Sequence, residues 1–294
     1  MLIEAFIDYL RFERGLSERT IEEYQNDLEA FESFFKSLDG DLTWNSVDTD
    51  IVREWVVQMM ERGNKASSVQ RRMSALRSCY RFLLKRGKVT RDPVRSITSP
   101  KKERVLPAFI REEDMQRLLD SENTFADNFE GRRDRLIIEL FYETGLRLSE
   151  LIGLNVEDIS LVAQTIRVTG KGNKQRLVPF GDRLLSLIKG YLDERAALPV
   201  IGSVAVFISA KGERLKGDKV RMMVKSKLGL VTTQKKRSPH VLRHTFATTM
   251  LNHDADLQTV KELLGHERLQ TTEIYTHTTF EELKRVYENA HPRA

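Results

Sequence analysis

A proline-rich basic segment, RDPVRSITSPKKERVLP at residues 91–107, constrains the fold of this chain more than any other feature. Proline has no backbone N–H and breaks the interior of a helix, so no regular element is expected to run through this segment. Its small polar and basic residues are typical of a linker. With 294 residues, the chain also has the length of about two domains. We therefore expect an N-terminal domain at 1–95, a basic linker at 96–106 and a larger domain at 107–294.

The N-terminal part is predicted to be helical, because its apolar residues recur at spacings of three and four. Ser17 and Asp48 are residue types that cap helices, and Gly63 and Gly87 are typical of helix ends. Ser67 with Gln70 matches a capping box. The expected helices are 3–11, 17 to near Gly40, 48–63 and 67–86.

The part after Pro107 has a mixed pattern, in which helices surround two short strands joined by the turn-rich sequence TGKGNK. The fold class predicted here is mainly α, a helical N-terminal domain followed by an α-rich domain with a small antiparallel β-sheet. The expected helices are 112–121, 132–144, 148–154 and 183–196, with everything after Gly217 helical between breaks at Ser238-Pro239, Asp254, Gly265, Thr271 and Thr278. The expected strands are 164–168, 175–179 and VAVFIS at 204–209.

Charge is concentrated in particular stretches, although the chain as a whole carries only +5. Residues 1–61 hold 5 basic and 15 acidic side chains, whereas residues 62–104 hold 14 basic side chains and only Asp92 and Glu103. A second basic stretch at 211–243 has 11 basic residues against two acidic ones. Two such stretches in one chain favour a polyanionic partner, most simply nucleic acid. The alternative for either stretch alone is a solvated surface.

The expected helix 67–86 contains no acidic residue, so it lacks the mixed charges that stabilise an ordinary solvated helix. An apolar stripe runs along one side of it, through Val69, Met73, Leu76, Tyr80, Leu83 and Leu84. The opposite side carries Gln70, Ser74, Arg77, Arg81 and Lys85. We predict that this side lies against DNA, with the cations on phosphates and Gln70 or Ser74 reaching base edges. The alternative is a solvated face.

Several classes of protein are disfavoured by what the sequence lacks. A single cysteine, Cys79 among apolar neighbours, excludes an internal disulfide framework and fits a reducing cytoplasm. No apolar run approaches the length of a membrane span, and the N-terminus does not resemble a signal peptide. The motifs of zinc proteases, serine hydrolases and P-loop nucleotide sites are missing. We therefore expect no metal, no cofactor, no membrane association and a cytoplasmic location.

Five short motifs in the second half carry candidate functional residues. SPHVLRHTFAT begins a helix at which His240 and Arg243 share one face, and a helix N-terminus favours an anion. The other motifs are GLRLSEL with Arg147, GKGNKQRLVP with Lys171, LLGHERL with His266 and TTEIYTH with Tyr275. Each motif taken singly is also compatible with an ordinary helix end, turn lysine or packed tyrosine.

Read in order, these motifs resemble the tyrosine recombinase (phage integrase) family, and most closely its Xer branch. The resemblance covers nearly the whole chain: the helical part resembles the SAM-like core-binding domain of the family, and the ending HPRA is Xer-like. Two departures are Leu148 and Thr249, neither at a position corresponding to a catalytic residue. The family fold implied is a C-shaped clamp of two domains around DNA.

The resemblance implies that Tyr275 attacks a DNA phosphodiester, forming a 3′-phosphotyrosyl bond and releasing a 5′-hydroxyl. Arg147 and Arg243 would clamp the non-bridging oxygens, since guanidinium groups bind phosphoryl oxygens bidentately. Lys171 would protonate the leaving oxygen.

In the same resemblance, His240 assists proton transfer and His266 hydrogen-bonds the scissile phosphate. Such a gathering of cations can supply the charge stabilisation that other enzymes take from metal ions. The complete set of six residues argues against a catalytically silent DNA-binding regulator.

The implied partners are double-stranded DNA with a specific recombination site and a homo- or hetero-tetramer on two duplexes. In the Xer branch a paralogous recombinase and a division-linked DNA translocase join them, for resolution of chromosome or plasmid dimers.

A mobile-element integrase, a DNA invertase and a type IB-like topoisomerase remain alternatives. In related recombinases a C-terminal segment like 280–294 docks on a neighbouring subunit; docking on its own domain is the alternative.

Overall fold

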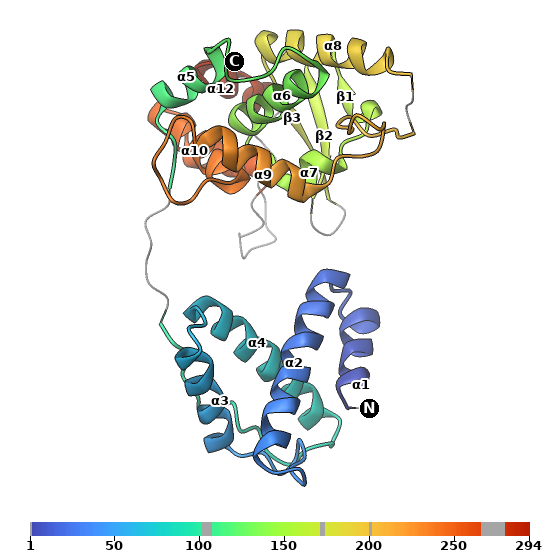
Figure 1. Cartoon of the computed structure of the whole chain (residues 1–294), viewed down its shortest axis with the longest axis vertical. Coiled ribbons are helices and arrows are strands. Elements are labelled where there is room, and N and C mark those ends of the chain that lie inside the picture. The colour runs from blue at the N-terminus through green and yellow to red at the C-terminus, as the bar shows by residue number, and fades with distance from the viewer. Residues whose placement is uncertain (1, 102–107, 171–173, 200–201, 266–279) are drawn as a thin grey trace. The chain divides into compact units, whose positions relative to one another are not determined.

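The computed structural model describes residues 2–101, 108–170, 174–199, 202–265 and 280–294. The chain packs as two compact units, Met1–Val105 and Leu106–Ala294 (Figure 1). Each unit has its own hydrophobic core. No helix in the described ranges is both long and apolar enough to cross a membrane.

The N-terminal unit is helical, as the sequence predicts. Its helices are α1 (Leu2–Asp8) continued by the π-helical turn η1 (Tyr9–Glu13), α2 (Glu18–Leu38), α3 (Thr49–Glu61) and α4 (Ala66–Lys85). Ser17 and Asp48 cap α2 and α3 by accepting backbone N–H groups, from Thr20 in the first case and from Asp50 and Ile51 in the second. Both capping predictions are confirmed. A cap can be predicted from sequence because it joins the N-cap side chain to a backbone N–H no more than three residues later.

The capping box expected at Ser67 is wrong. Helix α4 starts at Ala66 with Lys65 at the N-cap, so Ser67 lies inside the first turn. The preceding turn decides the start, since both the backbone N–H and the side-chain amide of Asn64 donate to the carbonyl of Met59, at 3.0 and 2.9 Å. The chain leaves that turn already aligned to begin the helix. Gly87 follows α4 with φ of +62°, as a helix-ending glycine requires.

Aromatic side chains from α2, α3, α4 and the α2–α3 loop fill the core of this unit. Phe31 contacts Trp44 and Trp55, with ring centroids 5.7 and 4.8 Å apart. The hydroxyl of Tyr80 donates to the carbonyl of Trp44 at 3.0 Å. Cys79 is buried as expected, and burial raises the pKa of its thiol to about 12, so it is an inert core residue.

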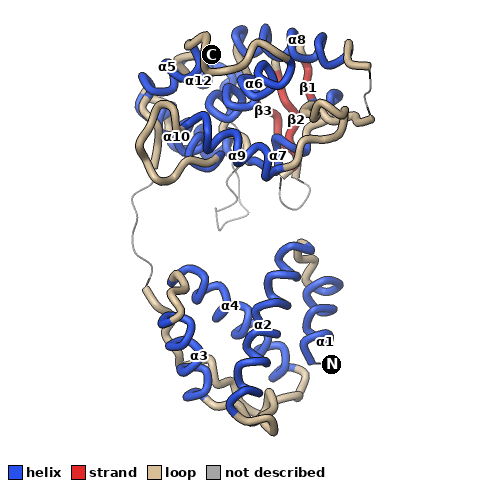
Figure 2. The backbone as a smooth tube through the Cα atoms, viewed as in Figure 1, coloured by secondary structure: helices blue, strands red, loops and turns tan. Residues whose placement is uncertain are grey.

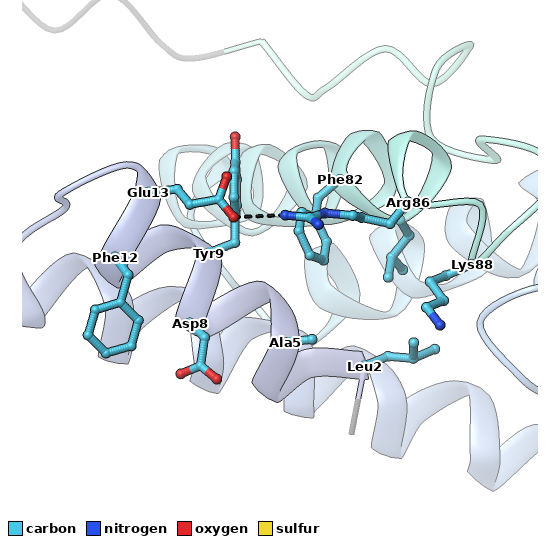
Figure 3. Close-up of a pocket in the computed structure, with 10 residues that line it drawn as sticks. Leu2, Ala5, Asp8, Tyr9, Phe12, Glu13, Phe82, Arg86 and Lys88 are labelled. Carbon is cyan, nitrogen blue, oxygen red and sulfur yellow. Dashed lines mark hydrogen bonds and ion pairs between the residues drawn. The ribbon is translucent and has the colours of Figure 1, made fainter.

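A groove of about 460 Å³ lies between α1–η1 and α4. Figure 3 shows the guanidinium of Arg86 reaching the carboxylate of Glu13, at 2.8 Å, near the rings of Tyr9 and Phe82. Those two rings pack with centroids 4.8 Å apart. The contact ties the end of α4 to the start of the chain.

The second unit is α-rich around a three-stranded antiparallel sheet (Figure 2), which confirms the predicted fold class. Strand β2 (Thr165–Thr169) pairs with β1 (Ile159–Ser160) and with β3 (Gln175–Pro179), so that Ile166 faces Val178. The helices are α5 (Glu112–Asp120), α6 (Phe129–Thr144), α7 (Leu148–Gly153), α8 (Asp182–Ala196), α9 (Gly217–Leu228), α10 (Pro239–Asn252), α11 (Leu257–Leu264) and α12 (Phe280–Ala290), with a 3-10 turn η2 (Val156–Asp158) before β1. Helix α6 packs against both α8 and α10 and is buried along its second half.

The strand expected at VAVFIS does not form, although residues 205–208 are buried. Only isolated bridges occur there, from Ala205 to Asn155 and from Ile208 to Arg214. Two of its carbonyls accept hydrogen bonds from side chains of α8: Arg195 donates to the carbonyl of Ala205 at 3.0 Å, and Tyr191 to that of Val206 at 3.1 Å. A ladder cannot extend where side chains occupy its acceptors.

The C-terminal segment docks on its own unit. Helix α12 packs against α10, α11 and β3, and Tyr287 is almost fully buried. Beyond it, Arg293 donates to Glu139 on α6 at 3.1 Å and to Asp120 on α5 at 2.7 Å. In this structure, therefore, the own-domain arrangement is the one observed.

Beneath this segment, Glu143 lies one turn after Glu139 on α6, and both are buried. Burial and the neighbouring Glu139 carboxylate raise the pKa of Glu143 well above its ordinary value of 4.5. The folded protein therefore keeps a proton that the unfolded chain releases as the pH rises above about 4.5, and stability falls over that range. We expect Glu143→Gln, which is neutral at every pH, to raise the melting temperature at pH 8 by roughly 4 °C, about 1–2 kcal/mol.

Thermal unfolding followed from pH 5 to 9 measures this effect. The exposed Glu281→Gln on α12 is the control and should leave the pH dependence unchanged. A Glu143→Gln variant with the pH dependence of the wild type, or with lower stability at pH 8, would contradict the assignment of a retained proton.

Candidate active site

Arg147 is held at the junction of two helices. Helix α6 ends at Gly145, whose φ of +59° turns the chain, and Arg147 is the N-cap of α7. The guanidinium of Arg147 donates to Glu150 Oε1 at 2.7 Å and to the carbonyl of Gly265 at 3.0 Å. Its backbone N–H donates to Glu150 Oε2 at 2.8 Å. About a third of the side chain stays exposed, so this arginine is fixed in direction and still accessible.

Arg243 extends from the second turn of α10 and is buried. It donates to the carbonyl of Gly145 at 2.5 Å and to that of Leu264 at 2.7 Å. Burial, together with the positive charges of Arg147 and Arg176, lowers the pKa of Arg243 to about 10, although the Glu150 carboxylate opposes this shift. Arg147 and Arg243 are thus brought together at the end of α11, as the proposed phosphate clamp requires. Buried cations at close range favour a bound anion.

Glu150 and Arg176 belong to the same cluster, although neither is among the residues predicted from the motifs. The Glu150 side chain is 1% exposed and Arg176 forks onto it with bonds of 2.8 and 3.0 Å. Burial would raise the pKa of Glu150, but hydrogen bonds from Arg176 and Arg147 lower it to about 2. The spacing of Glu150, three residues after Arg147 in GLRLSEL, is the sequence signal that could have identified it.

A cavity of about 640 Å³ lies beside Arg147 and is lined by the base of the β2–β3 hairpin. Thr169, Gly170 and Lys174 contribute to its wall, and the N–H of Gly170 donates to the carbonyl of Lys174 at 2.8 Å. The hairpin prediction is confirmed at its two strands. Lys171, at the predicted tip, lies outside the described residues.

His240 is exposed on the first turn of α10, after Ser238 at the N-cap and Pro239 at the first helical position, as predicted. It lines a cavity of about 340 Å³ together with Lys236, Arg237 and His244. His240 therefore shares a helix with Arg243 but opens onto its own basic cavity.

Two further predicted residues, His266 and Tyr275, lie outside the described residues. Helix α11 ends at Gly265 with φ of +64°, which confirms the expected break there. The carbonyls of Leu264 and Gly265 accept hydrogen bonds from Arg243 and Arg147. In the sequence, His266 follows directly after this pair of contacts.

The five residues predicted to face DNA from α4 divide into two groups. Gln70 donates to the carbonyl of Pro100 at 2.6 Å and Arg77 to that of Ile97 at 2.7 Å, so both hold the segment that follows α4. Ser74, Arg81 and Lys85 are exposed. Arg81 and Lys85 line a cavity of about 710 Å³ that also includes Arg14, Tyr24 and Ser78.

Comparison with known families matches both units. Residues 108–282 match the model of the phage integrase family, and residues 3–87 match the phage integrase N-terminal SAM-like domain. Among curated relatives, tyrosine recombinase XerC of Chlorobaculum tepidum is 38% identical, over 98% of this chain and 94% of its own length. XerC of Azotobacter vinelandii is 39% identical, over 99% and 96%.

Solved structures agree with the fold. XerH site-specific recombinase bound to difH substrate in a pre-cleavage complex is 26% identical, covers 96% of this chain and 83% of its own, and has a TM-score of 0.71. A lambda integrase dimer bound to a COC′ core site shares the fold, with a TM-score of 0.71 at 18% identity, over 100% of this chain and 96% of its own. The domain matches and the full-length relatives together show that this chain belongs to the phage integrase family, as a site-specific tyrosine recombinase of the Xer branch.

Proposed function

We propose that this recombinase cuts and rejoins double-stranded DNA at a specific site through a 3′-phosphotyrosyl intermediate. The observation that carries the proposal is the convergence of Arg147 and Arg243 on the end of α11, with hydrogen bonds of 2.5–3.0 Å to fixed acceptors. Cations held in advance of the reaction stabilise developing phosphoryl charge without reorganising. The motif that follows α11 supplies His266 and Tyr275.

In the proposed reaction, the phenol of Tyr275 gives up its proton with the assistance of His240, its oxygen attacks the phosphorus, and the bond from phosphorus to the 5′ oxygen breaks. Lys171 gives a proton to that oxygen, which leaves as a 5′-hydroxyl. Because the new phosphotyrosyl ester keeps the free energy of the broken ester, a 5′-hydroxyl from another strand can reverse the step without a nucleotide. Arg147 and Arg243 neutralise the non-bridging oxygens throughout.

The two histidines are assigned supporting roles in this proposal. His240 assists proton transfer, and His266 donates a hydrogen bond to the scissile phosphate. A neutral imidazole has one ring nitrogen that can accept a proton and return it in the reverse direction of the reaction.

We assign residues 1–95 to DNA binding, 96–106 to a linker and 107–294 to catalysis. The excess of basic residues over 62–104 and 211–243 supports contact with the phosphate backbone from both parts. We further propose that the protein acts as a homo- or hetero-tetramer on two duplexes, with a paralogous recombinase and a DNA translocase as partners in resolving chromosome dimers. The similarity to relatives named XerC supports this role over integration or inversion.

Mapping the DNA sites that the protein captures covalently in a genome tests the proposal. Protein–DNA adducts recovered after denaturation should map to one or a few positions that share a sequence. A plasmid carrying two copies of that sequence should then recombine. If plasmids that lack the sequence are relaxed as fast as plasmids that carry it, the protein would instead be a topoisomerase.

We expect Arg81→Ala with Lys85→Ala to flatten the slope of log affinity against log salt by about 1.8, near 0.9 for each lost phosphate contact. Both side chains are exposed on α4 beside the 710 Å³ cavity. Arg77 is left out of this pair, because it holds the carbonyl of Ile97. Binding titrations of the recovered site over a range of salt measure the slope.

The matched control is Lys36→Ala with Arg53→Ala. These two cations pair with acids on their own helices, Lys36 with Glu32 at 3.4 Å and Arg53 with Asp50 at 2.7 Å. Their removal should leave the slope unchanged. If the α4 pair has no larger effect than this control, DNA binds elsewhere on the unit.

A further inference from the structure

Three arginines from three different elements meet three consecutive carbonyls at the end of α11. Arg176 on β3 donates its Nε–H to the carbonyl of Leu263 at 3.0 Å. Arg243 and Arg147 donate to the next two carbonyls, those of Leu264 and Gly265, at 2.7 and 3.0 Å. The last carbonyls of a helix lack partners within it and form the negative end of its dipole, so they suit cations.

The two terminal nitrogens of the Arg176 guanidinium both donate to the carboxylate of Glu150. Its Nη1 and Nη2 donate to Glu150 Oε1 and Oε2 at 2.8 and 3.0 Å, and the side chain is 16% exposed. The same two oxygens accept from Arg147, Oε1 from the guanidinium and Oε2 from the backbone N–H. Glu150 is therefore shared between Arg147 and Arg176.

Removing Arg176 would leave a buried carboxylate with a single cationic partner, which is strongly unfavourable. The other charged groups facing this position are Arg243 on α10 and, on the wall of the cavity, Lys174 and Glu262. They do not replace the fork, because among the described residues only Arg147 and Arg176 donate hydrogen bonds to the oxygens of Glu150.

We propose that Arg176 is a positioning residue for cleavage: it holds Glu150 and the end of α11 so that Glu150 directs Arg147 toward the scissile phosphate. The inference rests on the proposed role of Arg147 as a phosphate clamp. In this arrangement Arg176 contacts no DNA. Its hydrogen bonds connect β3, the strand that follows Lys171 in the sequence, to Glu150 on α7 and to the end of α11.

The test compares Arg176→Met and Arg176→Lys with the wild-type protein on nicked DNA that carries the captured site. We expect Arg176→Met to slow single-turnover cleavage by about 100-fold, the size of effect that follows a displacement of about 1 Å, while site affinity changes less than twofold. Arg176→Lys keeps one charge but loses the fork, so it should recover only part of the rate.

The pH profile separates positioning from a general loss of structure. In the wild type, the pKa of Glu150 is about 2, so cleavage should show no loss from this group between pH 8 and 5. With one cation gone in Arg176→Met, the pKa of Glu150 rises, and cleavage should fall further as the pH is lowered. Adding Glu150→Gln to that variant should remove the extra acid-side loss.

Arg167→Met is the matched control, since Arg167 lies on the neighbouring strand β2 and bonds to Asp158 at 3.0 Å instead. It should cleave at the wild-type rate.

The inference would be overturned if Arg176→Lys cleaved at the wild-type rate. It would also be overturned if Arg176→Met lost the same factor in cleavage rate at every pH. Arg147→Ala distinguishes the two proposals: if it cleaves normally, the clamp itself is wrong, whereas its inactivity beside a fully active Arg176→Met overturns only the positioning role.

Discussion

Replacing Tyr275 with phenylalanine should abolish the covalent protein–DNA adduct on a nicked suicide substrate, while binding to the site remains nearly intact. Only the phenol oxygen is removed, and in the proposed reaction that oxygen forms the bond to phosphorus. The phenol has an ordinary pKa of about 10, so its attack depends on the surrounding cations. The adduct is measured by denaturing electrophoresis and the affinity by a binding titration.

Tyr287→Phe is the matched control, because Tyr287 is a buried tyrosine of α12 in the same part of the chain. It should form the adduct at close to the wild-type level. An adduct that persists in Tyr275→Phe would mean that another side chain is the nucleophile, and the central assignment of the mechanism would fail.

Replacing Gly145 with alanine should destabilise the second unit by about 2–5 kcal/mol, the sum of roughly 1–2 for a left-handed backbone and 1–3 for overpacking. Gly145 has φ of +59°, and an added Cβ would lie 2.6 Å from Phe246 Cδ1 and 2.7 Å from Leu264 Cδ2. Both neighbours are buried. Its carbonyl also accepts from Arg243, so cleavage should fall in whatever fraction stays folded.

Gly87→Ala supplies the comparison. Gly87 has φ of +62° at the end of α4, but a Cβ there would meet nothing within 4 Å. Its substitution should cost only the backbone term, about 1–2 kcal/mol. Calorimetric unfolding of the two variants measures the difference. If both glycines cost the same, the contact with Phe246 and Leu264 relaxes without penalty, and Gly145 does not fix the position of Arg243.

Local signals in the sequence were sufficient for most of the helices and for the hairpin. The caps at Ser17 and Asp48 and the left-handed glycines at Gly145 and Gly265 each depend on a few adjacent residues. The family resemblance likewise rested on short motifs in a fixed order, and the domain matches and relatives confirm it.

Contacts between residues far apart in the sequence could not be predicted from those local signals. Nothing in the sequence near α4 shows that Gln70 and Arg77 turn back to the carbonyls of Pro100 and Ile97, 30 and 20 positions away. The sequence VAVFIS predicts a strand, but in the structure Arg195 and Tyr191 of the preceding helix donate to the carbonyls of Ala205 and Val206. In both cases side-chain donors compete for the backbone, and only packing decides which donor is near.

The sequence by itself determined the helical elements and the segregation of charge, because each is a property of composition or of neighbours along the chain. Only the tertiary structure decided how the arginines are held. Arg176 reaches Glu150 across 26 positions and Leu263 across 87, and Arg147 reaches Gly265 across 118. Periodicity fixes which residues share one face of one helix. It carries no information on which elements the core brings together, and this cluster of arginines forms only where α7, β3, α10 and α11 meet.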